Sequence, residues 1–201
     1  MKRIKLIVAY DGTNYCGWQT QINGITVEEV LNKTLSGLLK EDIRIQESCQ
    51  VADDFHPRFC NTIKTYEYKI LNRKFALPTE RLYSAFVYYP LDVEKMQMAA
   101  AYLVGEHDFK SFCSSGSQVE STVRTITDIS VEKHGEMISI RVSGNGFLYN
   151  MVRIIVGTLM KIGLGVWEPE RMEEILNACD RNAAGPKAEA RGLTLVEIRY
   201  L

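Results

Sequence analysis

Residues 144–165 form an apolar stretch that begins and ends with pairs of glycines. Its large apolar side chains recur at spacings of three and four residues, which predicts a helix packed against a core; they are Phe147, Met151, Ile155, Leu159 and Ile162. Between residues 144 and 160 the only charge is Arg153. An unpaired buried guanidinium is costly, so either an acid or a phosphate meets Arg153, or its stem packs while its head reaches water. The stretch alone leaves both alternatives open.

The overall composition sets limits on the class of protein. The chain has 201 residues, 46% of them hydrophobic and 24% charged, as in ordinary globular proteins. The net charge is −1, so an anionic partner needs a local basic patch. Five scattered cysteines without a C-x-x-C pair argue against a disulfide framework or a zinc site and fit a reducing cytoplasm. The apolar run near residue 1 is too short for a signal peptide, and no stretch predicts a membrane span.

Strands and helices are predicted in mixed order in the first part of the chain. Alternating or continuous apolar residues predict strands at residues 2–10, 43–51 and 59–71. A loop rich in turn-forming residues fills positions 11–19, and a helix runs from Thr26 to near Lys40. The helix and the next strand are separated by only a few residues.

Residues 58–81 carry a net charge of about +4, with tyrosines between the cations. This mixture suits a surface on which bases stack beside a phosphate backbone. A strand with half-buried tyrosines and solvated cations explains the same pattern, and the pattern alone favours that simpler interpretation.

The second part of the chain predicts an antiparallel sheet with helices. A strand at residues 82–90 precedes a helix that starts at Asp92 and is capped by residues 105–108. Strands at 123–131 and 137–143 flank a turn and predict a β-hairpin. A helix at 168–178, a loop at 181–191 and a strand at 193–200 follow the apolar helix. The predicted class is α+β with a mostly antiparallel sheet.

Several blocks of residues, in their order along the chain, resemble the tRNA pseudouridine synthase A family. The blocks are Asp11-Gly12 through Gly17-Trp18-Gln19, Asp53-Asp54-Phe55-His56 with Arg58-Phe59, Lys64-Thr65-Tyr66-Glu67-Tyr68, Gly105-Glu106-His107-Asp108-Phe109 with Ser111-Phe112, Asn145 to Gly157 with Arg153, and Ala190-Arg191-Gly192-Leu193. The resemblance runs almost from end to end, and a series of ordered blocks is far more specific than a lone motif.

The resemblance implies an isomerase that converts uridine to pseudouridine in the anticodon stem-loop of tRNA without a cofactor or a metal. The target nucleotide leaves its stack, and a carboxylate then acts as nucleophile or base. By match, Tyr66 lies against the flipped uracil, and Arg153 is the ion-pair partner of the catalytic aspartate. The residues implied to contact RNA are Asp11, Gly17, Trp18, Gln19, Arg58 and Lys64.

The resemblance also implies the architecture and the assembly. It predicts the pseudouridine synthase fold, in which two ferredoxin-like halves share one mostly antiparallel sheet. Here the halves correspond to residues 1–72, a truncated first half, and 73–201. A cytoplasmic homodimer is expected.

The family's catalytic aspartate has no counterpart in this sequence. It belongs to an Arg-Thr-Asp-Ala-Gly-Val-His-Ala-like block after the first helix, and the one Arg-Thr pair, Arg124-Thr125, continues with Ile126. Of the eight aspartates, four fall in other family blocks, three lie in the second half, and Asp42 lacks the flanking residues. The segment Lys187-Ala188-Glu189 also departs from the family's usual proline-bearing pattern.

The short connection after Lys40 therefore predicts that several tens of residues are missing there, by a real deletion or by an artefact of the sequence. Three alternatives follow. The first is a synthase that is active only if the real gene product contains the missing block. The second is a catalytically dead protein that still binds tRNA, and the third is a decayed product without function. Without the carboxylate, activity should be negligible, and the fold should be marginal unless Arg153 finds phosphate, water or another acid.

Overall fold

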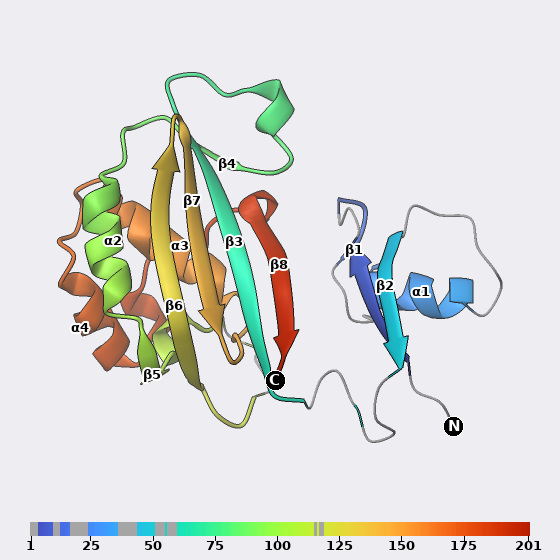
Figure 1. Cartoon of the computed structure of the whole chain (residues 1–201). Helices are drawn as coiled ribbons and strands as arrows, with labels where there is room; N and C mark the ends of the chain where they lie inside the picture. Colours follow the sequence, from blue (N-terminus) through green and yellow to red (C-terminus); the bar gives the residue numbers. More distant parts are fainter. Residues whose placement is uncertain are drawn as a thin grey trace. The chain divides into compact units, whose positions relative to one another are not determined.

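A computed structural model of the chain describes residues 4–9, 13–16, 24–35, 44–50, 55, 60–114, 116 and 119–201 (Figure 1). The chain divides into two compact units, Met1–Cys60 and Asn61–Leu201. The expected boundary of the ferredoxin-like halves, between residues 72 and 73, is a different division and stays a prediction. The units separate before residue 72 because the strand at residues 62–72 pairs within the sheet of the second unit.

The first unit contains two strands and a helix in its described part. Strand β1 (Ile4–Ala9) pairs antiparallel with β2 (Arg44–Gln50), with a register shift between Ile7 and Val8. Helix α1 (Val27–Leu35) lies between them in sequence. Thr26 is buried just before α1, and its Oγ1 accepts a hydrogen bond from the backbone N–H of Glu29, 3.3 Å away. The described parts of these elements fall where they were predicted, while the predicted end of the helix and the junction lie outside the described residues, at 36–43.

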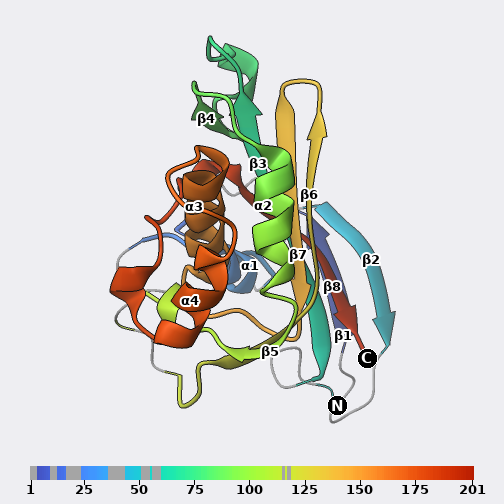
Figure 2. The same ribbon diagram turned by 90° about the vertical axis from the view of Figure 1, so that its left-hand side faces the viewer.

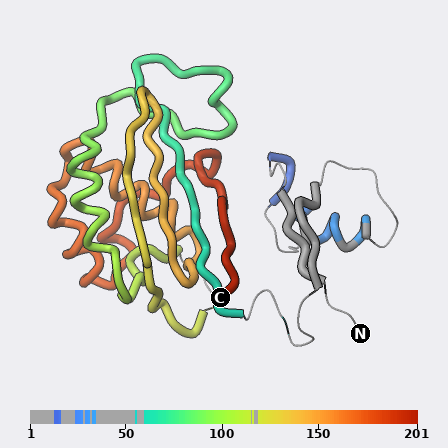
Figure 3. Tube along the Cα trace, in the orientation of Figure 1, coloured from blue at the N-terminus to red at the C-terminus, as the bar shows by residue number. Residues whose placement is uncertain are grey.

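The second unit is built on a six-stranded sheet with the order β4-β3-β7-β6-β5, in which β8 also pairs with β3. Only the β3–β4 pairing is parallel, and the other pairings are antiparallel. The strands are β3 (Thr62–Asn72), β4 (Ala85–Val87), β5 (Gly105–Asp108), β6 (Val123–His134), β7 (Met137–Gly144) and β8 (Leu193–Tyr200). Strand β8, the last of the chain, lies beside β3, the first of this unit (Figure 3). The α+β class with a mostly antiparallel sheet is confirmed.

Three helices cover one face of this sheet (Figure 2). They are α2 (Val93–Ala101), α3 (Met151–Gly163) and α4 (Arg171–Ala178). Ile138, Ile140 and Val142 of β7 are fully buried on the covered face. The opposite face is polar: the hydroxyl groups of Thr65 and Ser143 are 2.8 Å apart across β3 and β7. The predicted alternation of apolar and polar residues in β7 is confirmed.

Three predicted boundaries were wrong. Residues 105–108 do not cap the preceding helix, whose C-cap is Tyr102; they form β5 and pair with β6. The strand predicted at 82–90 is reduced to β4, since the main chain at residues 87–91 is held by the side chain of Asn72. Helix α3 begins at Met151, after Asn150 adopts a left-handed φ of 61°, so Phe147 lies before the helix and not on it.

Candidate active site

Arg153 lies in the first turn of α3, which is the most deeply buried helix of the second unit. The apolar side chains predicted to face the core do so: Met151, Ile155, Leu159 and Ile162 are at most 1% exposed. Arg153 itself is half-buried. The helix thus holds its one early charge at the edge of the core, where the guanidinium needs acceptors.

Neutral oxygen atoms supply those acceptors. The Nε–H group of Arg153 donates to the backbone carbonyl of Ala188 at 2.8 Å, and Nη1 donates to Oδ1 of Asn150 at 3.1 Å. Across the described residues, no ion pair joins Arg153 to a carboxylate. Glu189 is next to Ala188, but its carboxylate accepts from the Nε–H group of Arg191. The expected pairing of Arg153 with an acid is therefore not seen in the described part of the chain.

The described aspartates have other partners or lie elsewhere. Asp92 caps α2 by accepting from the backbone N–H of Lys95, and Asp180 caps a short turn through Asn182. Asp108 accepts from Lys110 and from Thr122. These carboxylates stabilise local backbone and are not positioned as a partner for Arg153.

Tyr66 lies on the face of β3 that carries Lys64 and Tyr68, because side chains alternate along a strand. Its ring makes an edge-to-face contact with Phe147, with the ring centroids 5.1 Å apart. Phe147 precedes α3, so this contact ties Tyr66 to the segment that leads into Arg153. The role of Tyr66 against a flipped uracil stays a prediction.

Tyr68 is fully buried, and its hydroxyl donates to the backbone carbonyl of Glu189 at 2.7 Å. Burial raises the pKa of Tyr68 to about 12; the Glu189 carboxylate adds to the rise, and Arg153 and Arg191 oppose it. Tyr68 and Arg153 therefore share one electrostatic environment. No residue pattern signals this link, because the acceptors on Ala188 and Glu189 are backbone carbonyl groups.

Two of the five cations in residues 61–81 pair with local acids. Lys69 lies 3.6 Å from the Glu67 carboxylate, and Arg73 pairs with Glu136 at 2.8 Å. Together with the burial of Tyr68, these contacts agree with the simpler interpretation of this segment as a packed strand. Five residues predicted to contact RNA lie outside the described residues, so those predictions remain untested: Asp11, Gly17, Trp18, Gln19 and Arg58.

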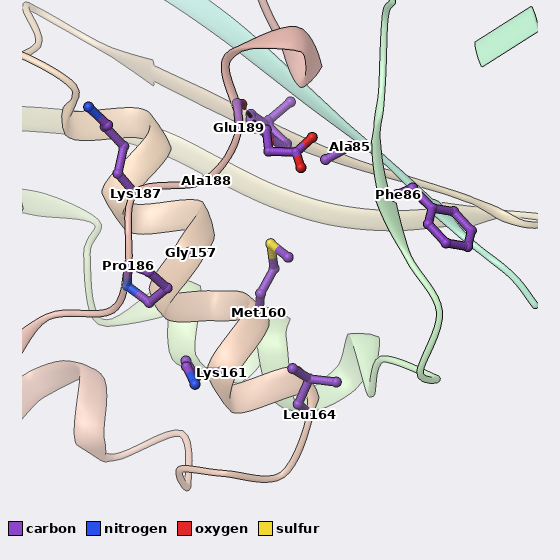
Figure 4. Close-up of a pocket in the computed structure, with 11 residues that line it drawn as sticks. Ala85, Phe86, Gly157, Met160, Lys161, Leu164, Pro186, Lys187, Ala188 and Glu189 are labelled. Carbon is purple, nitrogen blue, oxygen red and sulfur yellow. Dashed lines mark hydrogen bonds between the residues drawn. The ribbon is translucent and has the colours of Figure 1, made fainter. Parts of the chain in front are cut away.

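A pocket of about 270 Å³ lies next to this site (Figure 4). It is formed by β4, the second half of α3 and residues 186–189, and its lining includes Tyr68, Gly157, Lys161 and Glu189. Its lining residues include neither Tyr66 nor Arg153.

No group of three or more His, Cys, Asp or Glu side chains in the described ranges could hold a metal ion. None of the helices in those ranges is long and apolar enough to span a membrane.

The six-stranded, mostly antiparallel sheet with its covering helices defines an α+β protein and is consistent with the pseudouridine synthase fold. The family model described as tRNA pseudouridine synthase matches residues 99–201. The protein named tRNA pseudouridine synthase A from Thermoanaerobacter sp. (strain X514) is 40% identical over 244 aligned residues, covering 100% of both chains. Those from Brevibacillus brevis and, as tRNA pseudouridine synthase A 2, from Clostridium perfringens are 39% and 38% identical with the same coverage. The chain belongs to the tRNA pseudouridine synthase family.

The alignments are longer than the chain. They run over 244 positions, whereas this chain has 201 residues and is covered completely. Several tens of aligned positions therefore have no residue in this chain.

Proposed function

We propose that this protein binds tRNA, the substrate of its family's uridine-to-pseudouridine isomerisation, and that the chain as it stands does not catalyse that reaction. It keeps the arginine side of the site and lacks the carboxylate side. The observation that carries the proposal is that the sequence has no Arg-Thr-Asp block, while in the described part of the chain Arg153 donates to the neutral oxygens of Ala188 and Asn150.

One further observation supports the missing carboxylate. The alignments with the relatives contain several tens of positions that have no residue in this chain. A guanidinium can orient and stabilise an anion but cannot act as the nucleophile or base that the reaction needs. Arg153 and Tyr66 therefore cannot replace the aspartate.

The tRNA-binding part of the proposal rests on the residues that the chain retains. Lys64 and Tyr66 share one face of β3, and Phe147 holds the Tyr66 ring beside the segment that leads into α3. A cation and an aromatic ring on one surface suit a flipped base and its phosphate. We infer that the bound part of the tRNA is the anticodon stem-loop and that the protein acts as a homodimer in the cytoplasm, as expected for the family.

The test combines a turnover assay with a binding titration. The purified chain is incubated with unmodified tRNA transcripts, pseudouridine is mapped by chemical modification and primer extension, and gel shifts are measured at several salt concentrations. We expect no pseudouridine and binding that weakens as salt rises, because phosphate contacts release counterions. Turnover above a no-enzyme control would overturn the loss of activity.

A matched pair of variants tests whether binding uses the proposed surface. Lys64→Gln should weaken tRNA binding and flatten its salt dependence, whereas Lys133→Gln, near the end of β6, should leave both unchanged. Equal effects of the two variants would contradict the proposed surface. Absence of any salt-dependent binding by the parent chain would leave a decayed product as the better interpretation. Light scattering of the free protein checks the homodimer.

A further inference from the structure

Residues 185–189, which we name the α3 strap, run along α3 and make reciprocal hydrogen bonds with it. Arg153 donates through Nε to the carbonyl of Ala188, and the backbone N–H of Ala188 donates to the carbonyl of Arg153 at 3.0 Å. One turn further along, the N–H of Gly185 donates to Oγ1 of Thr158 at 3.0 Å. The strap is thus fixed to the helix at both of its ends.

Two glycines allow the strap to approach the helix backbone this closely. A Cβ atom on Gly157 would lie 1.7 Å from the carbonyl oxygen of Pro186, and one on Gly185 would lie 2.7 Å from Cα of Thr158. Both neighbours are backbone atoms that cannot move aside as a flexible side chain can. Figure 4 shows Pro186 and Ala188 beside Gly157 of α3.

Tyr68 holds the other side of the strap. Its hydroxyl donates to the carbonyl of Glu189, the residue after the one that accepts from Arg153. Its ring is packed against Gly192, where a Cβ would come within 2.7 Å of the ring carbons. Since Tyr68 belongs to the central strand β3, the strap is held between the sheet and α3.

We propose that Tyr68 is a positioning residue that sets the direction of the Arg153 guanidinium through the α3 strap. The Tyr68 hydroxyl holds the carbonyl group of Glu189 in place. Because Glu189 is bonded to Ala188, this also restrains Ala188, whose carbonyl accepts the hydrogen bond from Nε of Arg153. Asn150 holds Nη1 from the other side, while its own Nδ2 donates to Oγ of Ser114 at 3.0 Å. The inference rests on the proposed function for its purpose: with Nε and Nη1 engaged, the Nη2 edge is presented to an anionic ligand.

The proposal is tested in the free protein, so its outcome does not depend on tRNA binding. In protein labelled with ¹⁵N-arginine, the Nε–H signal of Arg153 is assigned by its loss in Arg153→Lys, and its exchange with water is measured. Tyr68→Phe should accelerate this exchange about fivefold, the factor that one net hydrogen bond contributes. Tyr102→Phe, just after α2, is the matched control and should leave the exchange unchanged. Unchanged exchange in a folded Tyr68→Phe protein would overturn the proposal.

A second pair of variants keeps the test decisive if Tyr68→Phe fails to fold. Thr158→Val removes the acceptor for Gly185, and Thr158→Ser keeps it. The valine variant should accelerate exchange of the Arg153 signal, and the serine variant should restore the parent rate. The same exchange rate in both variants would show that the strap does not control Arg153.

Discussion

Neutral acceptors engage the Nε and Nη1 donors of Arg153 but do not cancel its charge. Asn150 and Ala188 take up Nε and Nη1, and half-burial leaves part of the guanidinium hydrated. The cost of an isolated buried charge is thereby reduced without an acid. The prediction of a marginal fold unless Arg153 meets phosphate, water or another acid stays a prediction, and the neutral acceptors leave the positive charge available for an anion.

Replacing Arg153 by lysine should lower the free energy of unfolding by about 1.5–3 kcal/mol, the range for hydrogen bonds to charged groups. An ammonium group has no planar fork and cannot reach Ala188 and Asn150 with the same geometry. Urea unfolding measures the change. Arg171→Lys is the control, since Arg171 forms an exposed pair with Glu174 that should contribute at most about 1 kcal/mol. Equal losses in the two variants would contradict the structural role of Arg153.

The raised pKa of Tyr68 predicts a loss of stability in alkali. An unfolded tyrosine ionises near pH 10, and Tyr68 in the folded protein ionises at about pH 12. Between these values the unfolded state has released a proton that the folded state keeps, so the free energy of unfolding falls as pH rises. The contribution of Tyr68 to the free energy of unfolding is complete below pH 10. Above pH 10 this free energy falls by at most about 1.4 kcal/mol per pH unit through Tyr68.

Urea titrations of the parent protein and Tyr68→Phe between pH 9 and pH 11 measure this contribution. The phenylalanine variant should be less stable at pH 9, and its stability should fall less steeply with pH. Parallel curves for the two proteins would show that Tyr68 ionises with the same pKa in the folded and unfolded states.

At the scale of elements, the contact between α3 and its strap depends on Gly157. Gly157→Ala should destabilise the protein by about 1–3 kcal/mol, because the added Cβ collides with the carbonyl of Pro186 and the strap must move. Gly146→Ala is the control, since its Cβ would meet only the Arg124 side chain, at 3.5 Å. Thermal and urea unfolding check the pair. A Gly157→Ala protein as stable as the control would mean that the strap is not held closely to α3.

The elements with a regular apolar pattern were predictable from the sequence, and the exceptions have physical causes. The β6–β7 hairpin, α2 and β8 fall where the pattern predicts them. Strand β5 was missed because its four residues carry mostly polar side chains and its pairing with β6 supplies what the pattern lacks. The start of α3 was placed too early because Phe147 continues the helical spacing while packing on Tyr66 from outside the helix.

The candidate site was predictable only where side chains carry it. Arg153 stands out as one charge on an apolar helix, and Tyr66 as part of a family block. Ala188 lies 35 residues from Arg153 and contributes only a backbone carbonyl, which no residue pattern signals. Gly157 inside an apolar helix was the one available hint that another segment approaches the backbone there.

For the whole molecule, the two units differ in what holds them together. The second unit has a six-stranded sheet covered by helices and a continuous core. The described part of the first unit has one pair of strands and a nine-residue helix. A two-stranded sheet is marginal by itself in water, so this pair of strands depends on apolar contacts with other segments. The alignments with the relatives run over several tens of positions that this chain lacks, and we propose that the residues there supply further strands and the acid.

Restoring those residues should restore both activity and stability. The test is a chimera in which a segment is inserted after Lys40. The segment comes from the Thermoanaerobacter sp. (strain X514) relative and is the part that aligns with no residue of this chain. We expect the chimera to form pseudouridine in tRNA transcripts, and to unfold at higher urea concentrations than the parent chain, because its carboxylate can pair with Arg153 and its strands extend the first unit. Changing the aspartate of the inserted block to asparagine is the matched control. That variant should lose turnover and keep salt-dependent tRNA binding, because the amide has the same shape but cannot act as a nucleophile or base. A chimera that folds, binds tRNA and still forms no pseudouridine would show that the chain lacks more than the carboxylate.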